Sequence, residues 1–477
     1  MTWLSFLLLV FILHILIILL RESGEPRKLT AWLLLAFMFP YVAILAYWIA
    51  EHDYGARRMS RLIRKEFNGL PVLLAPSDPW RTEAERLRGY GKLRQMIGRI
   101  SVYPPCEAKS ARIYSEAGEF YRDLLEDMGR AEEHIHVQFY IFRDDGIGRQ
   151  VMELLKAKAA QGVEVRMILD GIGSLRFPRA RLSELTGSGV QVHIFLPTMM
   201  SILHKRINYR NHRKIVVCDG RCGYFGGMNI GDEHRGLDER IGPWRDTQLR
   251  IEGEAVYALQ HTFLRDWRLV SGEDLSSQVK YYPRGNGEAE DHGRTILQLI
   301  PSGPDQAEQA MFALFYGMLS VAASRIYITT PYFVPEESIM MALKAAAQSG
   351  LDVRLLIPGV GQHGEAPPAR PTLAHIEELL AAGVRVYEYQ RGFIHAKSVI
   401  IDSRIATVGT ANMDMRSFFS NFELNALIYT RSVVEELERQ FMNDLRCSKE
   451  MTDERFRRRT RWEKALEAGA RMLSPFF

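Results

Sequence analysis

One residue pattern occurs twice in this chain and limits its possible folds more than any other feature. The pattern is H-x-K-x4-D-x6-G-x-x-N, and it begins at His212 and again at His395. The glycine-initiated segments GVEVRMILDGIG (162–173) and GLDVRLLIPGVG (350–361) can also be laid over each other. Self-similarity of this kind indicates two copies of one structural unit. We therefore expect two halves, at 107–285 and 286–450.

Each copy alternates between strand and helix patterns. The expected elements are strand 135–142, helix 151–160 and strand 162–170 in the first copy, and strand 326–333, helix 338–348 and strand 350–358 in the second. A strand–helix–strand order predicts parallel strand pairing with a crossover helix. The fold class is therefore predicted to be α/β, with two similar halves forming one pseudo-symmetric body.

The spacing inside the motif predicts a cluster of polar side chains. Residues two apart on a strand face the same side, so each His is expected to project together with the Lys that follows it. A turn at the Asp and a returning strand would then bring the Asn back beside this pair. The catalytic candidates are His212, Lys214, Asp219, His395, Lys397 and Asp402, and the phosphate-binding or orienting candidates are Asn229, Asn412, Asp246 and Glu423.

These residue types fit chemistry on a phosphodiester. Two Lys and two Asn can bind the non-bridging oxygens. One imidazole can act as the nucleophile, and the other can donate a proton to the leaving alcohol. Two half-sites facing each other would supply all of this without a metal or a cofactor. Because the two motifs have the same spacing, the spacing does not say which His is the nucleophile.

Four carboxylates have two possible roles. Asp246 and Glu423 follow the first and second motifs, and each can fix the tautomer of an imidazole. A structural ion pair is the alternative for both. Asp219 and Asp402 stand at the predicted turns, where a structural role is the alternative to a catalytic one.

Two uncharged apolar runs occupy the N-terminus, at 2–20 and 29–50. Each is close to the ~20 residues that a helix needs to cross a bilayer. We predict a two-helix transmembrane hairpin at 1–50, with a signal sequence or buried core helices as alternatives. No basic residue precedes the first run and no small-x-small site follows Leu20, which disfavours a signal sequence. The basic flank at 57–65 favours a cytoplasmic body.

Two further segments are basic. They are a connector at 51–106 and an amphipathic tail at 451–477. Both mix cations with apolar residues and are expected to meet an anionic bilayer, with a solvated charge run as the alternative. The net charge of +4 does not argue for nucleic acid. The four cysteines are too few for a disulfide framework and fit a reducing compartment.

These motifs resemble the phospholipase D superfamily and, within it, the bacterial cardiolipin synthases. The similarity covers nearly the whole chain, including the N-terminal hairpin. The matching segments are 137–143, 208–214, 226–233, 244–246, 330–335, 387–390, 409–414 and 416–417. His363 also matches a family histidine, in a loop at 361–371 that is richer in proline than is usual for the family.

The resemblance implies a bacterial inner-membrane, multi-pass enzyme built from two phospholipase D-like α/β sandwich halves. Its reaction would condense two phosphatidylglycerol molecules into cardiolipin and glycerol through a phosphatidyl-histidine. By analogy, His212 would be the nucleophile and His395 the acid and base. Hydrolysis by a phospholipase D or a membrane nuclease is one alternative, and a catalytically inactive lipid-binding scaffold is another. The sequence makes no prediction of oligomeric state.

Overall fold

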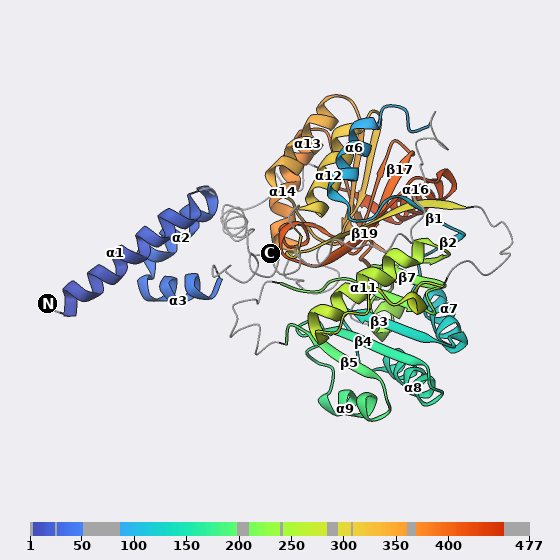
Figure 1. The fold of residues 1–477 in the computed structure, drawn as a ribbon. Helices are drawn as coiled ribbons and strands as arrows, with labels where there is room; N and C mark the ends of the chain where they lie inside the picture. The colour runs from blue at the N-terminus through green and yellow to red at the C-terminus, as the bar shows by residue number, and fades with distance from the viewer. Residues whose placement is uncertain are drawn as a thin grey trace.

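Each copy of the repeated pattern forms its own β-sheet in the computed structural model (Figure 1). The structure describes residues 3–23, 26–50, 86–197, 209–238, 242–283, 294–306, 309–359 and 369–452. Residues 51–85 of the predicted connector at 51–106, most of the predicted tail and His363 lie outside these ranges.

The first sheet has seven strands in the order β2-β9-β7-β6-β3-β4-β5. They are β2 (Ser110–Tyr114), β9 (Gln248–Glu252), β7 (Cys222–Gly226), β6 (Ile215–Cys218), β3 (His134–Phe139), β4 (Glu164–Asp170) and β5 (Gln191–Phe195). As predicted, β3 and β4 pair in parallel, with helix α8 (Gly146–Ala160) between them in the chain. Helices α7 (Ala117–Arg130) and α9 (Arg179–Gly187) also belong to this half.

The second sheet has nine strands in the order β1-β10-β19-β17-β16-β11-β13-β14-β20. They are β1 (Cys106–Ala108), β10 (Thr295–Ser302), β19 (Glu423–Ile428), β17 (Ile405–Gly409), β16 (Ser398–Ile401), β11 (Arg325–Thr329), β13 (Asp352–Pro358), β14 (Arg385–Tyr389) and β20 (Ser448–Glu450). The predicted parallel pair is present as β11 and β13. The boundary at 107 needs correction, because β1 pairs with β10 of the second half.

Two predicted strands are shorter than expected, each for a local reason. The first ends at Phe139, and the backbone N–H of Ile141 then donates to the side chain of Asn229 at 3.1 Å. The second ends at Thr329 and resumes as β12 (Phe333–Val334). Pro331 stands in the gap, and proline has no N–H to donate to a neighbouring strand.

The two sheets share one apolar core. Helix α11 (Ala255–Ser271) is buried along most of its length and lies between the halves in Figure 1. Its Phe263 and Trp267 belong to the same buried cluster as Leu249 of β9 and Leu424 of β19. The halves are therefore joined through a continuous hydrophobic interior, which fixes the position of one motif relative to the other.

The Asp of each motif closes a β-hairpin, β6–β7 in the first half and β16–β17 in the second. Asp219 and Asp402 have left-handed φ values of 53° and 54°, which Asp tolerates better than most residues. The Asp219 carboxylate accepts the backbone N–H groups of 132–134 at 2.8 to 2.9 Å. Asp402 accepts those of 323–325 at 2.6 to 2.8 Å. Both carboxylates therefore hold the start of a central strand.

The N-terminal apolar runs form three helices, α1 (Trp3–Glu22), α2 (Pro26–Met38) and α3 (Pro40–Ala50). Only α1, among the described helices, is long and apolar enough to cross a membrane. The second apolar run is not one continuous helix, because α2 ends at Met38 and α3 begins at Pro40, and a second crossing of the membrane stays a prediction. Proline lacks the N–H of a helix interior and its ring clashes with the preceding turn.

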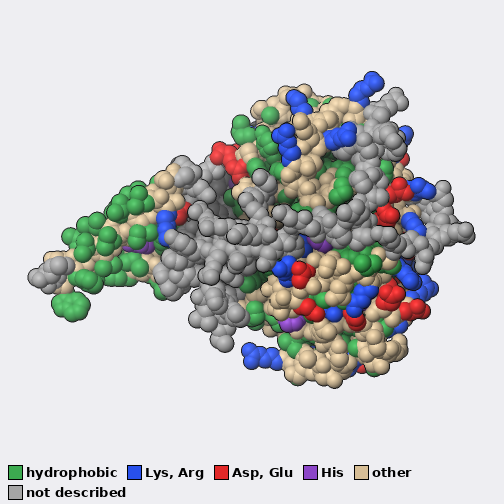
Figure 2. Space-filling model, viewed as in Figure 1, with side chains coloured by type: hydrophobic (Ala, Val, Ile, Leu, Met, Phe, Trp, Pro, Cys, Tyr) green, Lys and Arg blue, Asp and Glu red, His purple; other side chains and the backbone are tan. Residues whose placement is uncertain are grey.

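The three N-terminal helices pack against one another. Tyr47 donates a hydrogen bond to Glu22 at 3.0 Å, and its ring meets Trp32 edge to face at 5.1 Å. Their outer surface remains apolar, as the green side chains over these helices in Figure 2 show. Leu8 and Phe37, for example, are 59% and 66% exposed. An apolar surface of this extent is typical of a membrane-embedded segment.

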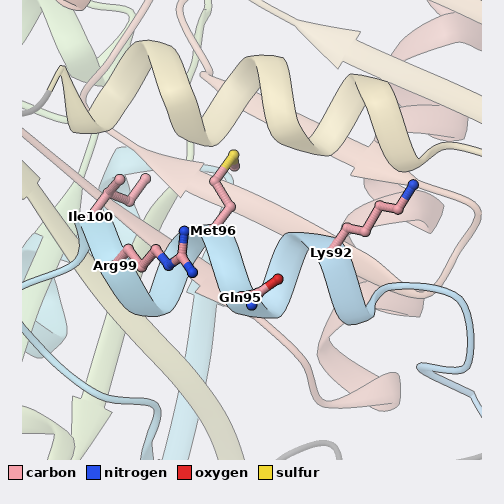
Figure 3. Close-up of a pocket in the computed structure, with 5 residues that line it drawn as sticks. All are labelled: Lys92, Gln95, Met96, Arg99 and Ile100. Carbon is pink, nitrogen blue, oxygen red and sulfur yellow. The ribbon is translucent and has the colours of Figure 1, made fainter.

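One cavity lies outside the motif region. It has a volume of about 340 Å³ and is lined by one face of helix α6 (Gly91–Ile100), as Figure 3 shows. The lining side chains are Lys92, Gln95, Met96, Arg99 and Ile100. None of them belongs to either motif, so this cavity is separate from the predicted site.

We predict that Asp219→Ala lowers the free energy of unfolding by about 2–4 kcal/mol, because three backbone donors at the start of β3 lose their acceptor. Thermal unfolding of the detergent-solubilised protein measures this. Glu126→Ala, which removes an exposed ion pair with Arg130, is the control and should change little. Unchanged stability with lost turnover would instead place Asp219 in the reaction.

Candidate active site

The first His–Lys pair lies on an extended segment immediately before β6, rather than within the strand as predicted. This segment is anchored to the other half of the body. The backbone N–H of His212 donates to the carbonyl of Phe422 at 2.9 Å, and the N–H of Phe422 donates to the carbonyl of Arg210 at 2.8 Å. The first motif is therefore held by the residues that enter β19.

The second His–Lys pair is held in the same way. It follows strand β15 (Phe393–Ile394), which pairs in parallel with β8 (Trp244–Arg245) of the first half. The backbone N–H of His395 donates to the carbonyl of Arg245 at 2.7 Å. Each motif thus forms backbone hydrogen bonds across the boundary between the halves.

Each imidazole is paired with a carboxylate from the opposite half. His212 Nδ1 lies 2.9 Å from Glu423 Oε2, and His395 Nδ1 lies 2.6 Å from Asp246 Oδ2. Both carboxylates are fully buried. A carboxylate accepts only, so at His212 Nδ1 carries the proton and Nε2 keeps its lone pair. At His395, Lys397 Nζ also lies 2.8 Å from Nδ1, and the Asp246 carboxylate is the closer partner and places the proton on Nδ1. The two predicted orienting acids are therefore in contact with the motif histidines, with their partners exchanged between the repeats.

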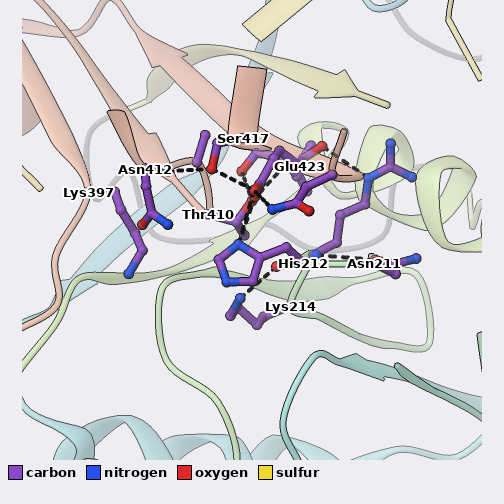
Figure 4. Close-up of polar contacts among 12 residues, drawn as sticks. Asn211, His212, Lys214, Lys397, Thr410, Asn412, Ser417 and Glu423 are labelled. Atoms are coloured by element: carbon purple, nitrogen blue, oxygen red, sulfur yellow. Dashed lines mark hydrogen bonds and ion pairs between the residues drawn. The ribbon is translucent and has the colours of Figure 1, made fainter. Parts of the chain in front are cut away.

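The Glu423 carboxylate has three further donors (Figure 4). Thr410 Oγ1 donates at 2.5 Å, Ser417 Oγ at 3.0 Å and Asn421 Nδ2 at 3.1 Å. Sequence reasoning missed all three residues. Thr410 lies inside the G-x-x-N element and Ser417 five residues beyond its Asn, so a closer comparison of the motifs could have found those two.

Arg213, between the first His and Lys, is also part of this support. It is buried and forms an ion pair with Asp266 at 2.5 Å. Its Nε donates to the carbonyl of Glu423 at 3.0 Å, and Nη2 donates to the carbonyl of Ser302 at 2.9 Å. Alternation along a strand places this side chain on the face opposite to the His–Lys pair. Its position allows it to fix the backbone of the residue that orients His212.

The two lysines are buried cations. Lys214 Nζ donates to the carbonyl of His212 at 2.6 Å, and Lys397 donates to the carbonyl of His395. Burial lowers the pKa of Lys214 to about 7 and that of Lys397 to about 8. Lys397 lowers the pKa of Lys214 further by like-charge repulsion. A bound anion would relieve this repulsion, as expected of a phosphate site.

Both imidazoles are neutral at physiological pH. Burial lowers the pKa of His212 to about 4 and that of His395 to about 3, although each carboxylate opposes the shift. Burial raises the pKa of Glu423, but His212 and Lys214 outweigh it and lower the value to about 2. Glu423 therefore stays ionised beside a neutral imidazole, whose Nε2 lone pair is available for nucleophilic attack.

The two Asn side chains differ in their contacts. Asn412 lies beside Lys397 in Figure 4, donates to Asp414 at 3.1 Å, and has a buried Oδ1 without a partner. Asn229 uses its Oδ1 to hold the chain after β3. Neither hydrogen bond involves a motif His or Lys, so their phosphate-binding role stays a prediction.

Asp219 and Asp402 hold strand starts through backbone hydrogen bonds, as described above, and do not contact the imidazoles. We therefore leave both out of the proposed catalytic set. In the described part of the chain, no group of three or more His, Cys, Asp or Glu side chains could hold a metal ion.

Comparisons with known proteins identify the family. A family profile described as "Cardiolipin synthase, PLD-like domain" matches residues 124–267 and 316–445. A cardiolipin synthase of Halalkalibacterium halodurans is 36% identical over 99% of this chain and 93% of its own length. One from Geobacillus kaustophilus is 38% identical over 97% of this chain and 92% of its own length. The chain belongs to the cardiolipin synthase family.

A solved structure supports the fold. A phosphatidylserine synthase of Haemophilus influenzae superposes with a TM-score of 0.61 at 14% identity, and the match covers 81% of this chain and all of that one. The predicted fold of two phospholipase D-like halves is therefore confirmed. Within this cardiolipin synthase family member, the two matched segments fall one in each half.

We expect kcat/KM for a chromogenic phosphodiester to fall at alkaline pH, as Lys214 (pKa about 7) and Lys397 (pKa about 8) lose their protons and bind the anion less well. Glu423 raises the pKa of Lys214, so Glu423→Gln should move this alkaline limb to lower pH. Glu438→Gln, on the surface beside Arg325, is the control and should leave the limb in place. A limb that does not move in Glu423→Gln contradicts this electrostatic account.

Proposed function

We propose that this protein is a phosphatidyltransferase that condenses two phosphatidylglycerol molecules into cardiolipin and glycerol. The observation that carries the proposal is the pair of buried imidazoles, each oriented by a buried carboxylate from the other half. Family membership supports the lipid substrate, because the matched relatives are cardiolipin synthases. The buried lysines supply the positive charge that a phosphodiester requires.

In the first step, His212 Nε2 attacks the phosphorus of one phosphatidylglycerol. A P–N bond forms, and the P–O bond to the glycerol headgroup breaks. His395 donates the proton that the departing glycerol oxygen needs. Although the pKa of His395 is low in the free protein, a bound phosphate anion favours its protonated form. Asp246 keeps the imidazole oriented so that Nε2 carries the transferable proton.

In the second step, a hydroxyl of another phosphatidylglycerol attacks the same phosphorus. His395 Nε2 takes the hydroxyl proton, a new P–O bond forms and the P–N bond to His212 breaks. The lysines bind the non-bridging oxygens in both steps, where negative charge develops. Glu423 stabilises the positive charge on His212 while it carries the phosphatidyl group.

The proposed setting is the surface of the bacterial cytoplasmic membrane. Helix α1 has the length and apolarity of a span, and the outer faces of α2 and α3 are apolar. The basic flank at 57–65 favours a cytoplasmic body. Anchoring would keep both half-sites close to the lipid headgroups of the bilayer. Both proposed substrates are lipids of that bilayer.

We expect purified full-length protein to convert phosphatidylglycerol in detergent micelles into cardiolipin and glycerol in equal amounts, measured by lipid mass spectrometry and a glycerol assay. His212→Ala and His395→Ala should each reduce turnover by at least about 10³-fold, because each removes a group that acts in both steps. Phosphatidic acid as the sole lipid product would replace the proposal with hydrolysis. Equal activity in wild type and His212→Ala would exclude the two-histidine scheme.

The covalent intermediate can be located directly. Alkaline quenching during turnover of phosphorus-labelled phosphatidylglycerol preserves an acid-labile P–N bond and should leave the label on the peptide that contains His212, because Nε2 of this residue is the proposed nucleophile. His212→Asn should remove the label. Label on the peptide that contains His395 would reverse the two roles and retain the rest of the scheme.

A further inference from the structure

The two His–carboxylate pairs have different surroundings, although the motifs around them match position by position. Five residues after the motif Asn, the second half has Ser417, whose hydroxyl donates to Glu423. The same position in the first half is His234. One residue after the motif Gly, the second half has Thr410, whereas the first has Gly227, where a Cβ would lie 2.0 Å from Asp246 Oδ1. The pair on the His395 side therefore lacks both hydroxyl donors.

His234 is buried beside this second pair without a hydrogen-bond partner for either ring nitrogen. Its side chain is 1% exposed. The indole Nε1 of Trp244 is also buried and unpartnered. The ring centroids of His234 and Trp244 are 4.4 Å apart, and those of Trp244 and His395 are 5.1 Å apart. The ring centroids of His234 and His395 are 6.2 Å apart, so the three rings pack against one another.

Unpartnered buried polar atoms are costly and therefore rare. Each costs about 1–3 kcal/mol relative to a paired group, and most native buried polar atoms have partners. Three such atoms gathered beside one motif imidazole indicate groups that a ligand satisfies. Around His212 the hydroxyls of Thr410 and Ser417 and the amide nitrogen of Asn421 instead pair with Glu423. The unpartnered buried atoms on that side are the amide oxygens of Asn412 and Asn421, so the unpartnered ring nitrogens of the described site gather beside His395.

The chemistry of these atoms indicates which ligand they fit. Indole N–H is a donor only, and a neutral imidazole has one donor and one acceptor. Burial holds the pKa of His234 well below its usual value, so the ring is uncharged. Such a set suits neutral hydroxyl groups, which donate and accept. It does not suit an ammonium group, which needs several acceptors, and it offers no charge to an anion.

We propose that His234 and Trp244 bind the free hydroxyl groups of the glycerol headgroup whose reacting oxygen exchanges a proton with His395. This inference rests on the proposed function and names the part of the substrate recognised on the acid–base side of the site. If this is so, the two residues make the enzyme prefer a polyol to a simple alcohol. They would act both when the first glycerol leaves and when the hydroxyl of the second substrate attacks.

A competition between two acceptors of equal carbon length tests this. Full-length protein is supplied with phosphatidylglycerol micelles and equal concentrations of isotopically labelled glycerol and 1-propanol. The ratio of labelled phosphatidylglycerol to phosphatidylpropanol reports relative kcat/KM and does not depend on the amount of active enzyme. Trp244→Phe and His234→Phe should each lower this ratio about tenfold, the factor that corresponds to one lost hydrogen bond of about 1.4 kcal/mol.

Matched variants distinguish hydrogen bonding to the glycerol hydroxyls from a purely structural role in packing around His395. His234→Gln, which keeps a donor and an acceptor, should restore most of the ratio. Phe393→Leu alters a neighbour of both Trp244 and His395 without removing a polar atom, so it should slow both acceptors alike. If His234→Phe does not fold, Trp244→Phe alone decides, because it keeps the ring packing.

The outcomes are distinct. An unchanged ratio in Trp244→Phe and His234→Phe overturns the subsite, as does an equal loss toward both acceptors. A wild-type protein that forms cardiolipin but does not prefer glycerol to 1-propanol also overturns it while leaving the proposed function intact. A wild-type protein that yields only phosphatidic acid rejects the proposed function itself.

Discussion

The exchange of carboxylates between the halves is the contact on which the site depends. Glu423 of the second half orients His212, and Asp246 of the first half orients His395. The backbone hydrogen bonds that place each histidine cross the same boundary. Neither half therefore contains a complete His–carboxylate pair, and the shared core around α11 has to hold both halves in register for either pair to form.

Burial decides the charge state of this exchanged arrangement. Desolvation lowers the pKa of both imidazoles and both lysines, while the carboxylates remain ionised. The result is a pair of neutral imidazoles in the free protein, next to lysines whose positive charge an incoming phosphate anion would stabilise. A single buried phosphodiester thus complements the electrostatics of both half-sites at once.

The two motifs are nearly identical, but the residues around them differ. Hydroxyl and amide donors surround Glu423, whereas aromatic rings with unpartnered nitrogens surround His395. Repeats that began with the same spacing can diverge at positions such as His234 and Ser417 without disturbing the hairpins that Asp219 and Asp402 close. Those hairpins are held instead by the Asp219 and Asp402 carboxylates, which accept backbone N–H groups at the starts of β3 and β11.

Local periodicity and the repeated motif were enough to predict the two halves, the parallel strand pairs and the His, Lys and acidic residues of the site, because the chain records them directly. They did not reveal the supporting residues Thr410, Ser417 and Asn421. The sequence also failed at the second apolar run, where Pro40 breaks a helix that hydropathy alone reads as continuous. Packing of the folded chain sets which acid pairs with which histidine, how Arg213 holds the backbone of Glu423, and that the ring nitrogens of His234 have no hydrogen-bond partner. Those contacts join residues up to 211 positions apart, and spacing along the chain carries no record of a distance that packing alone creates.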